Sequence, residues 1–353
     1  MADMKISEDR ELISAVSAVL GCPGNGEGDG SGTAGSGRIR LLEPLSAHTT
    51  FKCGGPAQLF IEAGNDDELA GLLRLFKERN VPYFILGRGS NLLVSDDGFN
   101  GAVVCLGGAY STIGICSGSS ENCSGEYSSS ESGPDGEKTG GTVVEAGAGA
   151  SLAALSGFAR DHSLDGLAFA CGIPGSVGGG IIMYAGAYGG ELKDVVLSVD
   201  VMDPVSIEIF TVPAPEMEFG YRTSRAKKEG FIVLRARFGL AKGDREAIAA
   251  KMEDLLLQRR QKQPLEYPSA GSTFKRPEGY FAGKLIQDAG LKGFSVGGAQ
   301  VSEKHSGFVI NRGGASAADV AELIETVRRK VYEDSGVMLE REVIYLGFDD
   351  TDK

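Results

Sequence analysis

The chain has 353 residues, more than one hydrophobic core usually organises, so several domains are expected. Its formal net charge of -13 disfavours binding to nucleic acids and to anionic membranes, and favours a small-molecule ligand. No apolar run approaches the ~20 residues that span a bilayer, and the acidic N-terminal segment is unlike a signal peptide. We therefore expect a cytoplasmic protein, either a monomer or a weak homo-oligomer.

The six cysteines and three histidines do not form a pattern typical of metal sites. No CxxC pair occurs, so no metal ligand is expected. In a reducing compartment the cysteines are best interpreted as scattered thiols.

The first predicted element is an N-terminal helix. Ser7 has the chemistry of an N-cap. Apolar residues follow it at helical spacing, namely Leu12, Val16, Val19 and Leu20. Residues 21–37 are rich in Gly and Ser and predict a flexible linker, so that residues 1–38 form an N-terminal helix and linker.

From residue 39 onward, strands and helices alternate, which is typical of α/β and α+β folds. Strands are expected at 59–64, 83–87, 101–108, 142–147, 195–202, 206–212 and 231–239. Helices are expected at 66–79, at 151–162 with Ser151 as N-cap, and at 244–262. Residues 117–141, rich in Ser, Gly and Glu, predict a disordered surface excursion between two strands.

A domain boundary is expected near Pro264 and Pro268, because proline interrupts regular structure. Beyond it the pattern predicts a helix at 281–289, strands near 296–301 and 306–311, a helix at 316–335 and a strand at 341–348.

Two glycine-rich loops are candidate ligand sites. LGRGSNLLVSDDGF (86–99) follows a predicted strand, and its small residues expose backbone N–H groups suited to a pyrophosphate. It matches neither the GxGxxG nor the GKS/GKT fingerprint, which argues against ordinary Rossmann and P-loop sites. In FACGIPGSVGGGIIMYAGAYGGE (169–191), glycines permit close approach of the backbone to a flat ligand. A cluster of tight turns is the alternative for either loop.

Three polar segments complete the candidate site. Ser272 lies in a Gly-flanked turn near Lys275 and Arg276, which suggests an anion site with a proton donor. Arg222, which follows Tyr221, is suited to bidentate binding of a carboxylate, although a surface arginine in a turn is equally compatible. LEREVIYLG (339–347) predicts a strand with Glu340 and Glu342 on one face, and either glutamate could simply be solvated.

Together the motifs resemble, in order and spacing, those of the UDP-N-acetylenolpyruvoylglucosamine reductase family in its shorter, type II form. The matching motifs are TTFKCGGPA (49–57), LGRGSNLLVSDDGF, GIPGSVGG, AGAYGGE, YRTS, QPLEYPSAGSTFKRPEGYFAGKLIQDAGLKG and GVMLEREV. The resemblance implies a mixed α+β and α/β fold. Residues 39–240 would form a two-part FAD-binding region of the vanillyl-alcohol-oxidase (PCMH) type, and residues 241–348 a C-terminal α/β substrate domain.

The resemblance also implies an activity. NADPH, through FAD, would reduce the sugar nucleotide UDP-N-acetyl-3-O-(1-carboxyvinyl)-glucosamine to UDP-N-acetylmuramate for peptidoglycan synthesis. FAD is expected to bind noncovalently, because GRGSN lacks the histidine that attaches flavin in covalent relatives. One departure is Tyr184, since relatives of this type commonly have asparagine at that position.

Site residues follow from the same resemblance. Ser272 would deliver a proton, Arg222 would bind the substrate carboxylate, and Glu342 would stabilise the enolic form. Tyr221, Lys275 and Arg276 are expected to bind substrate, the two cations through its phosphates. FAD is expected to contact Thr50, Gly54, Gly87, Arg88, Gly89, Ser90, Asn91, Leu92, Gly147, Gly172, Ile173, Pro174, Gly175, Ser176 and Gly179.

Two other interpretations stay open at this point. One is a different FAD-dependent sugar or alcohol oxidoreductase on the same scaffold, which would have no need of the PSAGSTFKR segment. The other is a nucleotide-binding regulatory module in which Ser272 is structural.

Overall fold

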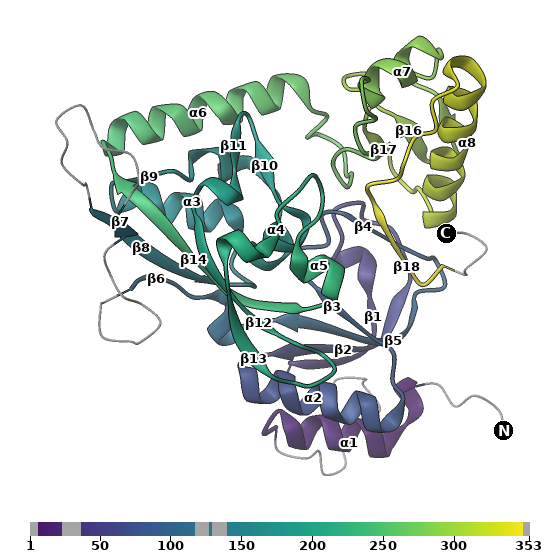
Figure 1. The fold of residues 1–353 in the computed structure, drawn as a ribbon. Coiled ribbons are helices and arrows are strands. Elements are labelled where there is room, and N and C mark those ends of the chain that lie inside the picture. Colours follow the sequence, from purple (N-terminus) through teal and green to yellow (C-terminus); the bar gives the residue numbers. More distant parts are fainter. Residues whose placement is uncertain (1–5, 23–36, 117–126, 129–139, 349–353) are drawn as a thin grey trace. The chain divides into compact units, whose positions relative to one another are not determined.

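The computed structural model describes residues 6–22, 37–116, 127–128 and 140–348 (Figure 1). The chain folds into two compact units. Unit 1 comprises Met1–Ile61, Glu78–Val104 and Arg260–Lys353, and unit 2 comprises Glu62–Lys77 and Cys105–Arg259. The predicted division into linker, FAD-binding region and substrate domain assigns residues by expected function, whereas the two units are defined by compact packing. The predicted division stays a prediction.

Unit 1 contains most of a four-stranded sheet with the order β1-β2-β5-β3. Its strands are β1 (Ile39–Pro44), β2 (Pro56–Ala63), β3 (Tyr83–Leu86) and β5 (Phe99–Leu106). Leu59, Phe60 and Ile61 on β2 are buried in succession, as expected for an inner strand covered on both faces. Helix α1 (Arg10–Val19) and two 3-10 helices, η1 (Ile6–Glu8) and η2 (Leu45–Ala47), precede or join these strands.

The C-terminal part of unit 1 is a small α/β layer (Figure 1). Helix α8 (Ala317–Ser335) packs on a three-stranded sheet of β15 (Ser295–Val296), β16 (Ala299–Val301) and β17 (Val309–Asn311), with α7 (Ala282–Asp288) beside it. Ser316 begins α8 with a capping box, in which it exchanges hydrogen bonds of 3.0 and 3.1 Å with Asp319. The last strand, β18 (Ile344–Leu346), pairs in parallel with β4 (Leu92–Val94), and this pairing joins the C-terminal segment to the N-terminal half of the chain.

Unit 2 is built on an antiparallel sheet with the order β13-β12-β14-β8-β6 (Figure 1). Its strands are β6 (Ile113–Ile115), β8 (Gly140–Gly147), β12 (Val196–Met202), β13 (Ile209–Pro213) and β14 (Ile232–Lys242), with β7 (Tyr127–Ser128) and β9 (Leu164–Asp165) paired at its margins. Strands β10 (Gly186–Ala187) and β11 (Gly190–Glu191) form a separate two-stranded antiparallel hairpin. The helices that lie wholly or mostly in unit 2 are α2 (Asp66–Arg79), α3 (Leu152–Asp161), α4 (Val177–Met183), α5 (Arg225–Glu229) and α6 (Arg245–Lys262), with η3 (Gly108–Ser111), η4 (Ala168–Gly172), η5 (Leu192–Asp194) and η6 (Ala214–Met217).

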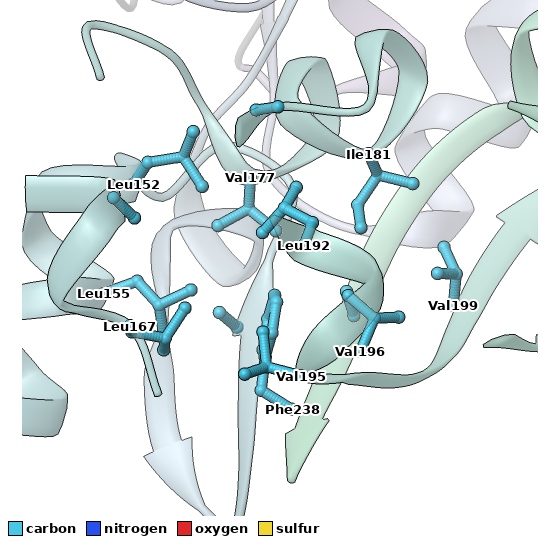
Figure 2. Packing of buried hydrophobic residues seen from close by; sticks show 14 of the residues in the cluster. Leu152, Leu155, Leu167, Val177, Ile181, Leu192, Val195, Val196, Val199 and Phe238 are labelled. Atoms are coloured by element: carbon cyan, nitrogen blue, oxygen red, sulfur yellow. The ribbon is translucent and has the colours of Figure 1, made fainter. Parts of the chain in front are cut away.

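The core of unit 2 lies between this sheet and helices α3 and α4 (Figure 2). Leu152, Val177 and Phe238 belong to one hydrophobic cluster, and all three side chains are fully buried. Burying a side chain of this size contributes about 1.5–3 kcal/mol. A Cβ on Gly180 would lie 3.1 Å from Leu152, so glycine lets α4 pack closely on α3.

Several predicted elements are confirmed with little change in their bounds. Helix α2 begins and ends where the acidic first turn and the apolar spacing predicted. Ser151 caps α3, because its Oγ accepts a 3.0 Å hydrogen bond from the Ala154 N–H. Helix α8 likewise starts after Ser316.

The predicted cap of the first helix is wrong. Asp9 caps α1 by accepting a 2.9 Å hydrogen bond from the Leu12 N–H. Ser7 instead lies in η1, where its hydroxyl donates to Gln58. Both residue types are good caps, and the contact with Gln58, far along the chain, decides between them.

Several predicted strands are shorter than expected, among them the strand near 306–311, which is observed as β17 and begins only at Val309. A turn in which the Ile207 N–H bonds Asp203 O delays β13 to Ile209. Gly297, with φ of +50°, turns the predicted strand 296–301 into the β15–β16 hairpin. β18 begins only at Ile344, so Glu340 and Glu342 precede it rather than sharing a strand face.

The glycine-rich stretch 169–191 contains α4, which the sequence did not predict because glycine disfavours helix. The expected excursion at 117–141 and linker at 21–37 lie almost wholly outside the described residues. The strand that precedes the excursion is β6, which the sequence did not predict, rather than β5, and β6 pairs in antiparallel register with β8 in the sheet of unit 2.

Candidate active site

The loop that follows β3 has the features of an anion-binding cradle. In the part of the chain that the structure describes, the backbone N–H groups of residues 88–91 have no hydrogen-bond acceptor. Gly89 has φ of +58°, and a Cβ there would lie 2.1 Å from His48 O. Only glycine therefore fits, and the loop packs directly on the chain near Thr50, whose N–H bonds Gly89 O at 3.1 Å.

The segment at 49–55 adds a second side to this cradle within unit 1. Gly54 has φ of +108°, and a Cβ there would lie 2.7 Å from Val94 O. Of the predicted FAD contacts, Thr50 therefore lies beside the loop 87–91, and Gly54 lies against Val94 on the strand that follows this loop. Leu92, also predicted as an FAD contact, lies in β4 and is 3% exposed, so its side chain is buried in the protein interior.

Ser272 and Glu342 lie on neighbouring backbone segments of unit 1. The Glu342 N–H donates to Thr273 O and the Lys275 N–H donates to Glu340 O, each at 2.9 Å. This pairing sets the half-buried Ser272 one residue before the paired stretch. Thr273 anchors it, because its fully buried Oγ1 accepts a 2.9 Å hydrogen bond from the Val309 N–H.

The two predicted phosphate ligands differ in their surroundings. Lys275 pairs with Glu340 at 2.9 Å, and this hydrogen bond lowers the pKa of the glutamate. The guanidinium of Arg276 lies 4.0 Å from the ring centroid of Phe281, which is 61% exposed. The sequence analysis did not predict that Phe281 lies against Arg276, although an aromatic residue five positions after an arginine can indicate such a contact.

In unit 2 the remaining predicted FAD contacts also converge. The loop 172–179 lies against 147–151, since the Leu152 N–H donates to Gly175 O and the Gly178 N–H donates to Ala148 O. A Cβ on Gly147 would lie 2.2 Å from Tyr110 O, so a side chain is excluded there. Residues 172–176 and Gly179 thus share one region with Gly147, and the Ser176 hydroxyl is engaged as the N-cap of α4.

Arg222 lies at the tip of a tight turn in unit 2. The Gly220 N–H bonds Thr223 O and the Thr223 N–H bonds Gly220 O. Arg222 has φ of +57°, a left-handed conformation that non-glycine residues rarely adopt and that clusters at functional sites. Its guanidinium lies 5.4 Å from the ring centroid of Tyr221, which is 56% exposed. Unit 1 carries Ser272 and Glu342, whereas Arg222 belongs to unit 2.

Tyr184 supports this turn. It ends α4 in a left-handed conformation, stacks on Phe219 with centroids 5.3 Å apart, and donates a hydrogen bond to Glu191. Burial and this hydrogen bond raise the pKa of Tyr184. Lys193 bonds the same carboxylate at 2.7 Å, and the hydrogen bonds from Lys193 and Tyr184 lower the pKa of Glu191.

Among the described residues, no group of three or more His, Cys, Asp or Glu side chains could hold a metal ion. The same part of the chain contains no helix both long and apolar enough to cross a membrane.

Comparisons with known proteins agree on one family. A family model of the C-terminal domain of UDP-N-acetylenolpyruvoylglucosamine reductase matches residues 263–346, and a model of an FAD binding domain matches residues 132–206. A reductase of this name from Caldanaerobacter subterraneus subsp. tengcongensis is 47% identical over 311 residues, which are 88% of this chain and 94% of that protein. One from Clostridium perfringens strain 13 is 46% identical with the same coverage.

A solved structure gives the same result. The crystal structure of the reductase (MurB) from Thermus caldophilus aligns with a TM-score of 0.67 at 34% identity, over 87% of this chain and 98% of that chain. The predicted mixed α/β fold, with an FAD-binding domain followed by a C-terminal domain, is confirmed. Because identity near 47% extends over almost the whole length of the relatives, the chain belongs to the UDP-N-acetylenolpyruvoylglucosamine reductase family.

Proposed function

We propose that this protein uses NADPH to reduce UDP-N-acetyl-3-O-(1-carboxyvinyl)-glucosamine to UDP-N-acetylmuramate, a step in peptidoglycan precursor synthesis. The observation that carries the proposal is the pairing of the Ser272 segment with Glu342 beside the cradle at 87–91. This arrangement joins a hydroxyl, a carboxylate and an anion site within one compact unit.

The residues present fit FAD. Backbone N–H groups at 88–91 without an acceptor suit a pyrophosphate, and Gly89, where a Cβ would meet His48 O, lets the loop pack on the chain at 48–50. When bound, FAD supplies hydride chemistry that no amino-acid side chain provides. Since the loop 87–91 contains no histidine, we expect a noncovalent cofactor that denaturation releases.

Each catalytic residue has a role that matches its chemistry. Hydride addition to an enolpyruvyl group leaves negative charge next to its carboxylate, and preorganised positive charge stabilises such a centre. Arg222 would bind that carboxylate and Glu342 would orient and stabilise the enolic form, whereas Ser272 would deliver the proton. Serine is a weak acid in water, so neighbouring groups must tune this transfer.

Substrate binding would fall to Tyr221, Lys275 and Arg276. Lys275 is 38% exposed and its partner Glu340 is 72% exposed, so solvent screens their ion pair. A phosphate could therefore displace the glutamate at small cost. The guanidinium of Arg276 lies over Phe281 and its Nε donates to Tyr280 O, and we expect it to bind a second phosphate oxygen.

The decisive experiment follows NADPH oxidation by the purified yellow protein with and without the enolpyruvyl sugar nucleotide. We expect oxidation to require that nucleotide and to yield the saturated lactyl ether. Reduction of the flavin by a simple sugar or alcohol, without NADPH, would favour another flavin oxidoreductase on the same scaffold. A colourless protein that binds a nucleotide without turnover would favour a regulatory module.

A cytoplasmic location and a monomeric or weakly self-associating state remain predictions. Sedimentation velocity over a range of protein concentrations tests the second, and cell fractionation tests the first.

A further inference from the structure

Three polar side chains tie the segments of the predicted FAD cradle to the C-terminal part of unit 1. The Asn311 amide donates to Phe51 O at 3.0 Å. The Asp96 carboxylate accepts from the first N–H groups of α8, at 2.8 and 2.9 Å. The Asn91 amide donates to Glu342 O at 2.9 Å. Only the last of these bonds reaches a residue with a proposed catalytic role.

Asn91 holds the backbone around Glu342 in two ways. Its own carbonyl oxygen accepts a 3.0 Å hydrogen bond from the Ile344 N–H, and its side-chain Nδ2 donates to the carbonyl of Glu342 itself. The direction of the second bond is chemically determined, because a carbonyl oxygen can only accept and the amide nitrogen of asparagine can only donate.

The peptide groups on both sides of Glu342 are consequently held. Its N–H bonds Thr273 O, in the segment next to Ser272, and its C=O bonds Asn91. With both peptides held, the Cα–Cβ direction of Glu342 has little freedom. Asn91 lies 251 positions away in sequence, at the end of the cradle.

We propose that Asn91 is a positioning residue for Glu342, which couples the conformation of the FAD cradle to the placement of the carboxylate. The proposal rests on the proposed function, since it takes the role of Glu342 from there. One N–H of the Asn91 amide is directed at Glu342 O, and the cradle would bind the cofactor mainly through the backbone N–H groups of residues 88–91. Loss of the amide should therefore affect substrate reduction more than cofactor retention.

The test compares Asn91→Ala with Asn311→Ala in the full-length holoenzyme. Both variants remove an amide that donates to a backbone carbonyl in unit 1, but only the first removes a bond to Glu342. Rapid mixing measures flavin reduction by NADPH and, separately, reoxidation of reduced enzyme by the enolpyruvyl sugar nucleotide. Fluorescence titration gives the FAD dissociation constant, and thermal melting reports stability.

For Asn91→Ala we expect reoxidation to slow by at least roughly tenfold, which corresponds to the loss of one hydrogen bond. Flavin reduction should stay within about twofold of wild type. Asn311→Ala should lower the melting temperature without changing the ratio of the two rates. Equal slowing of both half-reactions, or weaker FAD binding with normal reoxidation at saturating FAD, would overturn the proposal.

A double-mutant cycle provides a second readout. If Asn91 acts through Glu342, Asn91→Ala should add little to the slow reoxidation of Glu342→Gln. Additive losses would show that Asn91 acts elsewhere. Should Asn91→Ala fold poorly, Asn91→Asp preserves the shape of the side chain while removing the donor. If wild-type enzyme itself is not reoxidised by the sugar nucleotide, the proposed function fails, an outcome distinct from failure of the Asn91 assignment.

Discussion

Tyr184 occupies a position where the family resemblance predicts asparagine, and its contacts show what the tyrosine side chain does there. The ring stacks on Phe219, three positions before Arg222, and the hydroxyl bonds Glu191. Tyrosine also adopts the left-handed conformation that ends α4, with φ of 49°. An asparagine could satisfy that conformation but could not reach Phe219 by stacking. Tyr184 therefore supports the Arg222 turn through packing.

We expect Tyr184→Phe to lower the free energy of unfolding by about 1 kcal/mol, because it removes one hydrogen bond and retains the stack. Urea unfolding followed by circular dichroism measures the loss. Tyr188→Phe is the matched control, since Tyr188 is 40% exposed and has no hydroxyl contact among the described hydrogen bonds. Equal effects of the two substitutions would contradict a role for the bond to Glu191.

At Ser272 the prediction concerns rate rather than stability. Ser272→Ala should reduce turnover by about a hundred- to ten-thousand-fold, the usual contribution of a general acid, while NADPH still reduces the flavin at the normal rate. Single-turnover measurements separate the two steps. Ser269→Ala, in the same segment, should leave both steps unchanged. Near-normal turnover by Ser272→Ala would mean that another group delivers the proton.

At the scale of elements, local sequence signals predicted regular helices and missed features that tertiary packing decides. Helix α2 was predictable because acidic residues open it and Leu69, Leu72 and Phe76 recur at helical spacing. Helix α4 was not predictable, because its glycines oppose helix formation. They allow close packing instead, since a Cβ added at Gly178 would lie only 2.9 Å from the Ala148 side chain.

The candidate site shows the same division. The hydroxyl of Ser272, the carboxylate of Glu342 and the small residues of the loop at 87–91 could be selected from residue chemistry and family resemblance. Their pairing could not, because the bond from Asn91 to Glu342 joins segments 251 positions apart. Residue types indicate which chemistry is available, whereas strand register determines which groups become neighbours.

The sheet of unit 2 contains a buried ion pair that yields a prediction for two elements. Arg237 on β14 donates two hydrogen bonds to Asp200 on β12, at 2.9 and 2.8 Å, and both side chains are almost fully buried. Burial alone would raise the pKa of Asp200, but hydrogen bonds from Arg237 and Thr211, with the charges of Arg237 and Arg235, lower it below its usual 3.8.

We expect Asp200→Asn to destabilise the fold by about 1.5–3 kcal/mol near neutral pH, because it removes the carboxylate that accepts two hydrogen bonds from the buried Arg237 and leaves Glu145, 2.9 Å from the same guanidinium, as its counter-charge. A carboxyl whose folded pKa is depressed stabilises the fold above its unfolded pKa, and this contribution disappears as pH falls through the folded value. The difference from wild type should therefore shrink below about pH 3.8 in urea titrations. Asp161→Asn, which removes an exposed pair with Arg160, should have little effect at any pH.

For the whole molecule, the predicted FAD contacts divide between the two compact units: 87–92 belongs to unit 1, and 172–179 belongs to unit 2. If both sets bind the cofactor, FAD must slow amide hydrogen exchange in both segments. Ligand at about a hundred times its dissociation constant stabilises the bound form by about 2.7 kcal/mol, so exchange that requires release of the cofactor slows roughly a hundredfold.

Exchange measured by mass spectrometry on holoenzyme and on flavin-stripped protein tests this division. Residues 245–258 of α6 carry no predicted contact and serve as the internal reference. Short exchange times are needed, because exchange through global unfolding slows everywhere when a ligand binds, whereas local opening slows only where the ligand is held. Protection confined to 87–92 would mean that the contacts predicted in unit 2 are wrong, even if the enzyme proves active. Protection of both segments would establish that each unit contributes to cofactor binding, which sequence resemblance predicts and packing within either unit alone does not require.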